Sequence, residues 1–74
     1  MSVYEREHTM PLLRVSYASV QNDEKKAELI AELTKTTARV LGVQESSVWI
    51  ILDEVPRENW GAAGASLAER DRKR

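Results

Sequence analysis

The sequence predicts an α+β fold built on a βαβ unit with two parallel strands, followed by a small C-terminal hairpin or tail. Three observations predict it: an alternating apolar stretch at residues 12–18, an amphipathic stretch at 23–41, and five successive apolar residues at 48–52. A strand, a helix and a strand at this spacing form a right-handed crossover, in which the two strands lie parallel.

Composition excludes several classes of protein. A chain of 74 residues is one domain at most. Because it has no cysteine, disulfides and thiolate metal sites are excluded, and the single histidine, His8, cannot form a metal site alone. The net charge of −1 gives no electrostatic case for nucleic acid or an anionic membrane. No apolar run approaches the roughly 20 residues that span a bilayer. We therefore expect a cytoplasmic protein without metal, cofactor, nucleic-acid or membrane partner.

Composition also divides the chain into three parts. Residues 1–10 are mostly polar, include His8, and read as an N-terminal extension that is either disordered or not translated in nature. Residues 11–65 form the predicted domain. Residues 66–74 carry mixed charges, and we expect them to form a frayed, charged tail.

The first strand is predicted at residues 12–18, directly after Pro11. Leu13, Val15 and Tyr17 alternate onto one face of it, and a proline is tolerated at its start because no ladder donor is needed there. Met10 precedes this proline, so removal of the residues before Pro11 would leave a free secondary amine.

The helix is predicted at residues 23–41. Asn22 or Asp23 can cap its N-terminus, and Gly42 suits the left-handed residue that ends a helix. Six residues recur at three-to-four spacing and predict the face that packs on the sheet: Ala27, Ile30, Leu33, Thr37, Val40 and Leu41.

The second strand, at residues 48–52, has no polar side, which is typical of a strand buried on both faces. One helix covers only one face of a two-stranded sheet. The other face therefore favours cover by another subunit, and we expect an obligate oligomer. After this strand Pro56 stops the ladder, and residues 61–65 suit a tight hairpin or a close contact with a neighbouring chain.

These features together resemble the 4-oxalocrotonate tautomerase family. The resemblance runs from Pro11 to about Gly64, and its most specific parts are the Met10-Pro11 start and the segment 54–61, Glu-Val-Pro-Arg-Glu-Asn-Trp-Gly, with Asp23-Glu24-Lys25-Lys26 as support. It implies a βαβ unit with a hairpin, assembled as a homo-oligomer. In this family the usual assembly is a hexamer built as a trimer of dimers.

The resemblance also implies a mechanism. Pro11 maps onto the family's N-terminal proline, whose secondary amine moves a proton in a small enol or oxo acid, and Trp60 maps onto the pocket aromatic. An α-amino group titrates near pH 7.7–8.0, and an apolar pocket or nearby cations lower that pKa toward neutrality. A base poised near neutral pH transfers protons efficiently.

The sequence departs from the family pattern at three positions. Pro11 is not the first coded residue, and its nitrogen is an amide while Met10 is attached. The family's two arginines fall on Gln21 and Trp49, so a bidentate clamp for a dicarboxylate is lost. Arg57 is the better substitute as a substrate ligand and Arg14 the weaker one, with Gln21 as a further candidate.

Three interpretations stay open at this point. The first is an isomerase that uses Pro11 as its general acid and base. The second is a non-catalytic oligomeric scaffold or binding module of the same fold, with Pro11 blocked. The third is a subunit of a heteromer that supplies Trp60 or Arg57 to a pocket completed by another chain. Among enzymes, the sequence does not separate a tautomerase from a dehalogenase, hydratase or decarboxylase.

Overall fold

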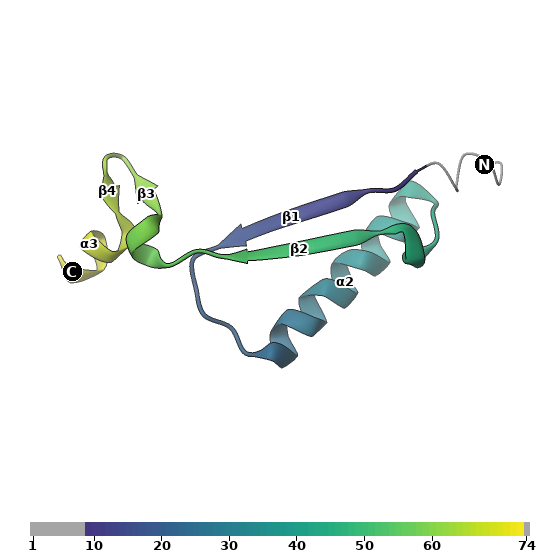
Figure 1. Ribbon diagram of the computed structural model, residues 1–74, viewed down its shortest axis with the longest axis horizontal. Coiled ribbons are helices and arrows are strands. Elements are labelled where there is room, and N and C mark those ends of the chain that lie inside the picture. Colours follow the sequence, from purple (N-terminus) through teal and green to yellow (C-terminus); the bar gives the residue numbers. More distant parts are fainter. Residues whose placement is uncertain (1–8, 74) are drawn as a thin grey trace.

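The computed structural model describes residues 9–73 and contains one βαβ unit with a small C-terminal module (Figure 1). Most of the predicted N-terminal extension, His8 included, lies outside these residues. The elements follow the predicted order of strand, helix, strand and hairpin. In the part of the chain that is described, no helix is long and apolar enough to cross a membrane.

The two long strands pair in parallel, as predicted. Strand β1 (Leu12–Tyr17) lies against β2 (Trp49–Glu54), with Leu12 opposite Trp49 and Tyr17 opposite Glu54. Strand β2 continues two residues beyond the predicted end because its backbone goes on pairing with β1. The last bond of the ladder runs from the N–H of Val55 to the carbonyl of Tyr17, just before Pro56.

Helix α2 (Asp23–Leu41) has the predicted bounds, and both caps form. The side-chain oxygen of Asn22 accepts a hydrogen bond from the N–H of Lys25 at 2.8 Å. At the other end Gly42 adopts a left-handed φ of 71°, and its N–H donates to the carbonyl of Ala38. Local capping chemistry therefore sets the length of α2 independently of what it packs against.

The packed face of α2 differs from the predicted one. Ala27 is exposed, and Val40 keeps 65% of its surface in solvent. The buried core instead joins Ala38 to Val43 and Val48, with Leu13 and Ile50 packed against them. The periodic apolar positions cover a wider arc of the helix than two strands can bury, so part of the predicted face stays exposed in the described part of the chain.

Helix α2 packs mainly against β2 and only weakly against β1. Its C-terminal half lies beside the strands, and its N-terminal end diverges from them (Figure 1). This divergence leaves open the space between the first turns of α2 and the helix-facing side of β1. The helix therefore covers one strand well and leaves a hollow under the other.

Within residues 9–73, no segment covers the opposite face of the sheet, as predicted. Leu12, Trp49 and Ile51 lie on it with 52%, 60% and 38% of their surface exposed. The chain is also elongated, with a radius of gyration of 16.8 Å, whereas a compact chain of this length has about 11 Å. The single chain therefore leaves much of its apolar surface unburied.

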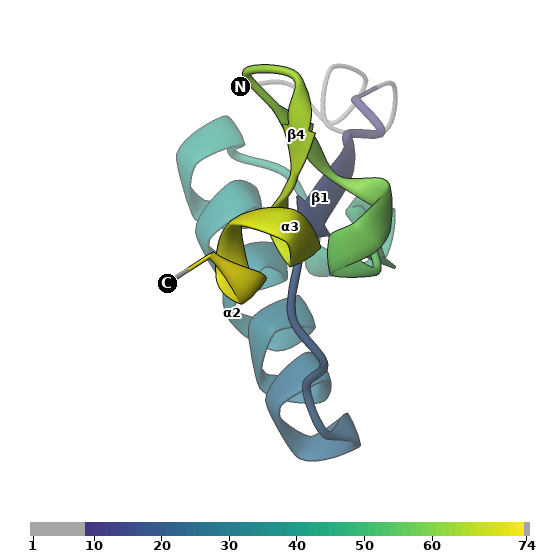
Figure 2. The ribbon, with the colours of Figure 1, turned by 90° about the vertical axis from the view of Figure 1, so that its left-hand side faces the viewer.

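The C-terminal module corrects the expectation of a frayed tail. Strands β3 (Gly61–Ala62) and β4 (Ala65–Ser66) form an antiparallel hairpin, and helix α3 (Leu67–Arg72) follows at once. Figure 2 shows this module gathered at one end of the molecule. The hairpin turn holds Ala63 and Gly64 at positive φ, which suits a two-residue turn. Ser66 caps α3 by accepting from the N–H of Glu69, a local signal that the charged composition obscures.

A polar cluster ties the end of β2 to the start of α2. The Glu54 carboxylate accepts from the backbone N–H of Gln21 at 3.0 Å and pairs with the Lys26 ammonium at 3.0 Å. The Gln21 N–H first, and Lys26 second, hold the pKa of Glu54 below its ordinary value. The hydrogen bond that the Lys26 ammonium donates to Glu54 raises the pKa of Lys26 in turn. The charged forms of both groups are therefore favoured by folding.

The stability that Glu54 contributes should depend on pH. A carboxyl group whose folded pKa is depressed stabilises the protein above its unfolded pKa, and the effect is lost as pH falls through the folded pKa. We expect Glu54→Gln to melt below wild type at pH 7, and the difference to shrink as pH falls below about 4. Thermal melts followed by circular dichroism from pH 7 downward would measure this.

Glu58→Gln is the matched control, because Glu58 is exposed and has no ion pair among residues 9–73. It should melt like wild type at each pH. A Glu54→Gln difference that stays constant down to pH 3 would contradict the assignment.

The uncovered sheet face should be an assembly surface. A buried isoleucine side chain contributes about 1.5–3 kcal/mol, and a carboxylate in its place adds a desolvation cost. We therefore expect Ile51→Asp to sediment as a smaller species than wild type. Val20→Asp makes the same kind of change in the loop after β1, where Val20 is 92% exposed, and should leave assembly intact. Identical sedimentation of wild type and Ile51→Asp would refute the prediction.

Candidate functional site

Pro11 lies at the amino end of the sheet, immediately before β1. Its carbonyl accepts a hydrogen bond from the backbone N–H of Trp49 at 3.0 Å, which fixes the residue against the first position of β2. The residue is half-buried, while the preceding Met10 is 63% exposed. The proline is thus anchored by its own carbonyl, and the residue directly before it is largely exposed.

The C-terminal module lies beyond the opposite end of the sheet (Figure 1). Arg57 and Trp60 belong to this module, directly before β3. Parallel strands run from the Pro11 end to this one over six residues, or roughly 20 Å at the usual rise of a strand. Gln21, in the loop after β1, is at the Arg57 end as well. Within one chain, the length of the sheet therefore separates Pro11 from Arg57, Trp60 and Gln21.

Gln21 is held by hydrogen bonds on both its backbone and its side chain. Its N–H donates to Glu54, and its side-chain amide donates to the Ser19 hydroxyl at 2.9 Å. These contacts fix the loop between β1 and α2. The amide still has acceptor capacity, so Gln21 can offer a polar contact to a ligand at this end of the sheet.

Gln21 also lines the hollow between β1 and the first turns of α2. This hollow has a volume of about 320 Å³, and its lining residues are Val15, Tyr17, Gln21, Lys25, Lys26 and Leu29. The Tyr17 hydroxyl has no hydrogen-bond partner of ordinary geometry among the described residues. Burial, and then the nearby Glu54 carboxylate, raise the pKa of Tyr17, so the phenol stays protonated.

Arg57 is engaged on several sides by its own chain. Its Nε and Nη2 donate to the two carboxylate oxygens of Asp71 at 2.5 and 3.0 Å, and Nη1 donates to the Ala18 carbonyl at 3.0 Å. The Asp71 carboxylate raises the pKa of Arg57. The guanidinium therefore joins α3 to the end of β1.

Arg14 lies on the outer face of the sheet and is 62% exposed. It pairs with Asp53, one strand across, at 3.3 and 3.4 Å. This face also carries Trp49, which stands where the resemblance expects an arginine. Both residues therefore lie on the exposed face of the sheet, away from the hollow and from the Arg57 end.

Trp60 is half-buried, and its backbone connects the turn at Arg57 to the start of α3. Its N–H donates to the Arg57 carbonyl, and its own carbonyl accepts from the N–H of Leu67 at the start of α3. The arrangement fixes the backbone of Trp60 relative to Arg57. It leaves the sheet end near Pro11 without an aromatic from this module.

Sequence reasoning missed Tyr17, Lys26 and Glu54 as a polar group, and Asp71 as the partner of Arg57. Glu54 and Lys26 belong to segments that the sequence singled out, but no pattern indicates that they meet. Asp71 lies among mixed charges with no distinguishing signal. Within residues 9–73 no cluster of three histidine, cysteine, aspartate or glutamate side chains could hold a metal ion.

Comparison with known proteins identifies the family. The family model described as tautomerase enzyme matches residues 11–70, so the match begins at Pro11 and includes most of α3. A probable tautomerase from Ralstonia nicotianae is 42% identical over 55 residues, covering 74% of this chain and 79% of that protein. The 2-hydroxymuconate tautomerase of Comamonas testosteroni is 30% identical over 63 residues, covering 85% of this chain and 100% of that one.

A solved structure supports the same assignment. The heterohexamer 4-oxalocrotonate tautomerase from Chloroflexus aurantiacus superposes with a TM-score of 0.75 and 37% identity, over 81% of this chain and 97% of that chain. The two chains thus share their fold over most of their length. With the family model matching from Pro11 into α3, the chain belongs to the tautomerase family.

Proposed function

We propose that this protein is an isomerase that moves a proton in a small enol or oxo acid. The observation that carries the proposal is the position of Pro11, which is the first residue of the family match and the anchored first residue of the fold. Freed from Met10, its nitrogen would be a secondary amine. In ketonisation this amine would accept the proton of the enol hydroxyl and return a proton to the carbon at the other end of the enol double bond. The substrate is then isomerised, and it neither gains nor loses atoms.

The surroundings of Pro11 suit such a base. Leu12 and Trp49 flank it with apolar surface, and their burial in an assembly would disfavour the ammonium form and lower the pKa of the amine. An amine titrating nearer neutrality is a more efficient general base at physiological pH.

Substrate binding in this proposal needs a second copy of the chain. Pro11 is at one end of the sheet, and Gln21, Arg57 and Trp60 are at the other. Among residues 9–73, β1 pairs only with β2 and so has a free edge, which supports pairing with a second chain. Antiparallel pairing of two β1 strands would bring the Pro11 end of one chain to the Gln21 end of its partner. We propose a homohexamer, the assembly implied by the family resemblance.

Arg57 would bind the substrate carboxylate and Trp60 would pack against its apolar part. Gln21 would donate or accept a hydrogen bond at the oxygen that develops negative charge. Because Arg14 is paired with Asp53 on the outer face, it is the least suited of the candidates. With a glutamine and a tryptophan at two positions where relatives are expected to carry arginine, a monocarboxylate suits this site better than a dicarboxylate.

The test compares three forms of the protein: a chain beginning at Pro11, the same chain with Pro11→Ala, and the full chain. Ketonisation of phenylenolpyruvate, a monocarboxylate, and of 2-hydroxymuconate, a dicarboxylate, is followed by absorbance. We expect the chain beginning at Pro11 to exceed the full chain by about 10²–10⁴-fold, the usual contribution of a general base. Pro11→Ala keeps a primary amine and should be intermediate.

Equal rates for the three forms would refute Pro11 as the base. In that case the alternative function, a non-catalytic oligomeric scaffold or binding module with Pro11 in an amide, would be favoured. The intact mass of the protein purified from its natural source separates the two as well. A mass that retains residues 2–9 favours the scaffold, and a mass beginning at Pro11 favours the enzyme.

A further inference from the structure

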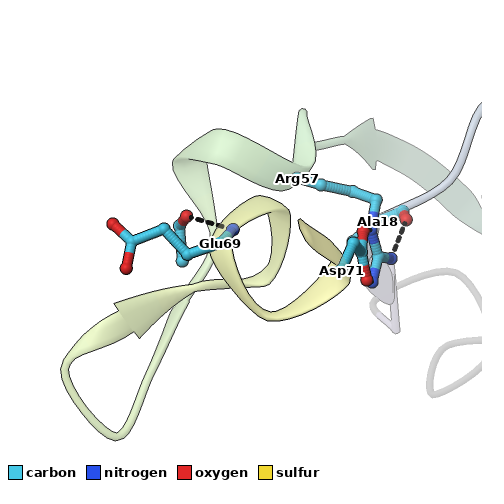
Figure 3. A network of polar contacts seen from close by, with 5 residues as sticks. Ala18, Arg57, Glu69 and Asp71 are labelled. Carbon is cyan, nitrogen blue, oxygen red and sulfur yellow. Dashed lines mark hydrogen bonds and ion pairs between the residues drawn. The ribbon is translucent and has the colours of Figure 1, made fainter. Parts of the chain in front are cut away.

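We propose that Asp71 is a specificity-determining residue, an internal carboxylate that occupies Arg57 and thereby weakens the binding of substrate carboxylates. The inference rests on the proposed role of Arg57 as the ligand of the substrate carboxylate. It assigns a function to α3, which the charged composition had indicated to be a tail. The observation behind it is the set of contacts that Arg57 makes within its own chain (Figure 3).

Arg57 already uses three of its N–H donors within its own chain. A guanidinium has five N–H donors. Two are taken by the two oxygens of Asp71, and a third is taken by the carbonyl of Ala18. The Asp71 contact uses the Nε–Nη2 edge in a fork, the geometry in which arginine binds carboxylates most strongly. A substrate carboxylate therefore either displaces Asp71 from this edge or uses the remaining two N–H groups.

The charge of Arg57 is compensated as well. The pair with Asp71 adds no net charge at the position where an anion would bind, so the electrostatic attraction for a carboxylate is reduced. At the same time the pair is exposed, with 45% and 44% of the two side chains in solvent. Exposed pairs are weak, so an incoming carboxylate can compete with Asp71. Asp71 thus reduces anion binding without preventing it.

The position of Asp71 is fixed by the fold of the module. Helix α3 is capped by Ser66 at its start, the Arg70 guanidinium donates to the Ala62 carbonyl in the hairpin, and the N–H of Leu67 donates to Trp60. These contacts hold α3 against the segment that carries Arg57. Release of the Asp71 carboxylate therefore need not move the helix, and substitution of Asp71 should change the charge around Arg57 while leaving the module folded.

The experiment measures binding of two inert probes to the full chain. Cinnamate has the ring and carboxylate of phenylenolpyruvate without the enol oxygen, and cinnamamide is its neutral counterpart. We expect Asp71→Asn to bind cinnamate about two- to fivefold more tightly than wild type, the gain that removal of a weak exposed competitor allows. Binding of cinnamamide should not change. Isothermal titration at low salt measures both affinities.

Glu69→Gln is the matched control. It removes one negative charge from the same helix, but the Glu69 carboxylate points away from Arg57 (Figure 3). If the gain came from the net charge of the protein, Glu69→Gln would produce it too. The double variant Arg57→Ala with Asp71→Asn should lose the gain in affinity, because Asp71 weakens anion binding only by occupying Arg57. Asp71→Ser, which also lacks a charge, repeats the test should the asparagine variant fold poorly.

Four results would overturn the proposal: cinnamate affinity that is unchanged or weaker in both Asp71 variants, an equal gain in Glu69→Gln, a gain that persists without Arg57, or no cinnamate binding in any form. None of these depends on proton transfer. If Pro11 proves not to be the base, the cinnamate result for Asp71 still stands. If the cinnamate experiment fails, the kinetic test of Pro11 is unaffected. In a catalytically active form, Asp71→Asn should lower KM for phenylenolpyruvate and leave kcat unchanged.

Discussion

The structure depends on a limit of packing: one amphipathic helix cannot bury both faces of a two-stranded sheet. Helix α2 lies mainly under β2, and its core contacts gather around Ala38, Val43 and Val48. Residues 9–73 leave the face carrying Trp49 and Ile51 exposed, and they leave the hollow beside β1 open. In the proposed oligomer, folding and assembly would be linked, because the apolar area needed for stability would be completed between chains.

The same limit shapes the chemistry. Two strands place the chain's groups at two ends, with the anchored Pro11 at the amino end and the charged residues at the carboxyl end. At the carboxyl end Glu54 joins β2 to α2, and Arg57 joins α3 to the end of β1. These polar contacts hold three segments around the loop that carries Gln21. In the proposed enzyme, assembly would then combine the base of one chain with the binding groups of another.

Part of the candidate site could be predicted from the sequence. Pro11 and Trp60 lie in the segments most specific for the family, and the bounds of α2 follow from Asn22 and Gly42, whose capping chemistry is local. Asp71 could not be found in this way. Its partner Arg57 is fourteen residues earlier, and the two meet only because the hairpin turn at Ala63 and Gly64 reverses the chain.

The sequence by itself determined the order of elements, the parallel strands, the uncovered sheet face and the family, since these depend on periodicity, caps and motif residues close together in the chain. The tertiary structure decided which arc of α2 is buried, that residues 67–72 form a helix, and that Pro11 and Arg57 lie at opposite ends of the sheet. The physical reason is that helix orientation and contacts between distant residues arise from packing among whole elements, which local patterns do not encode.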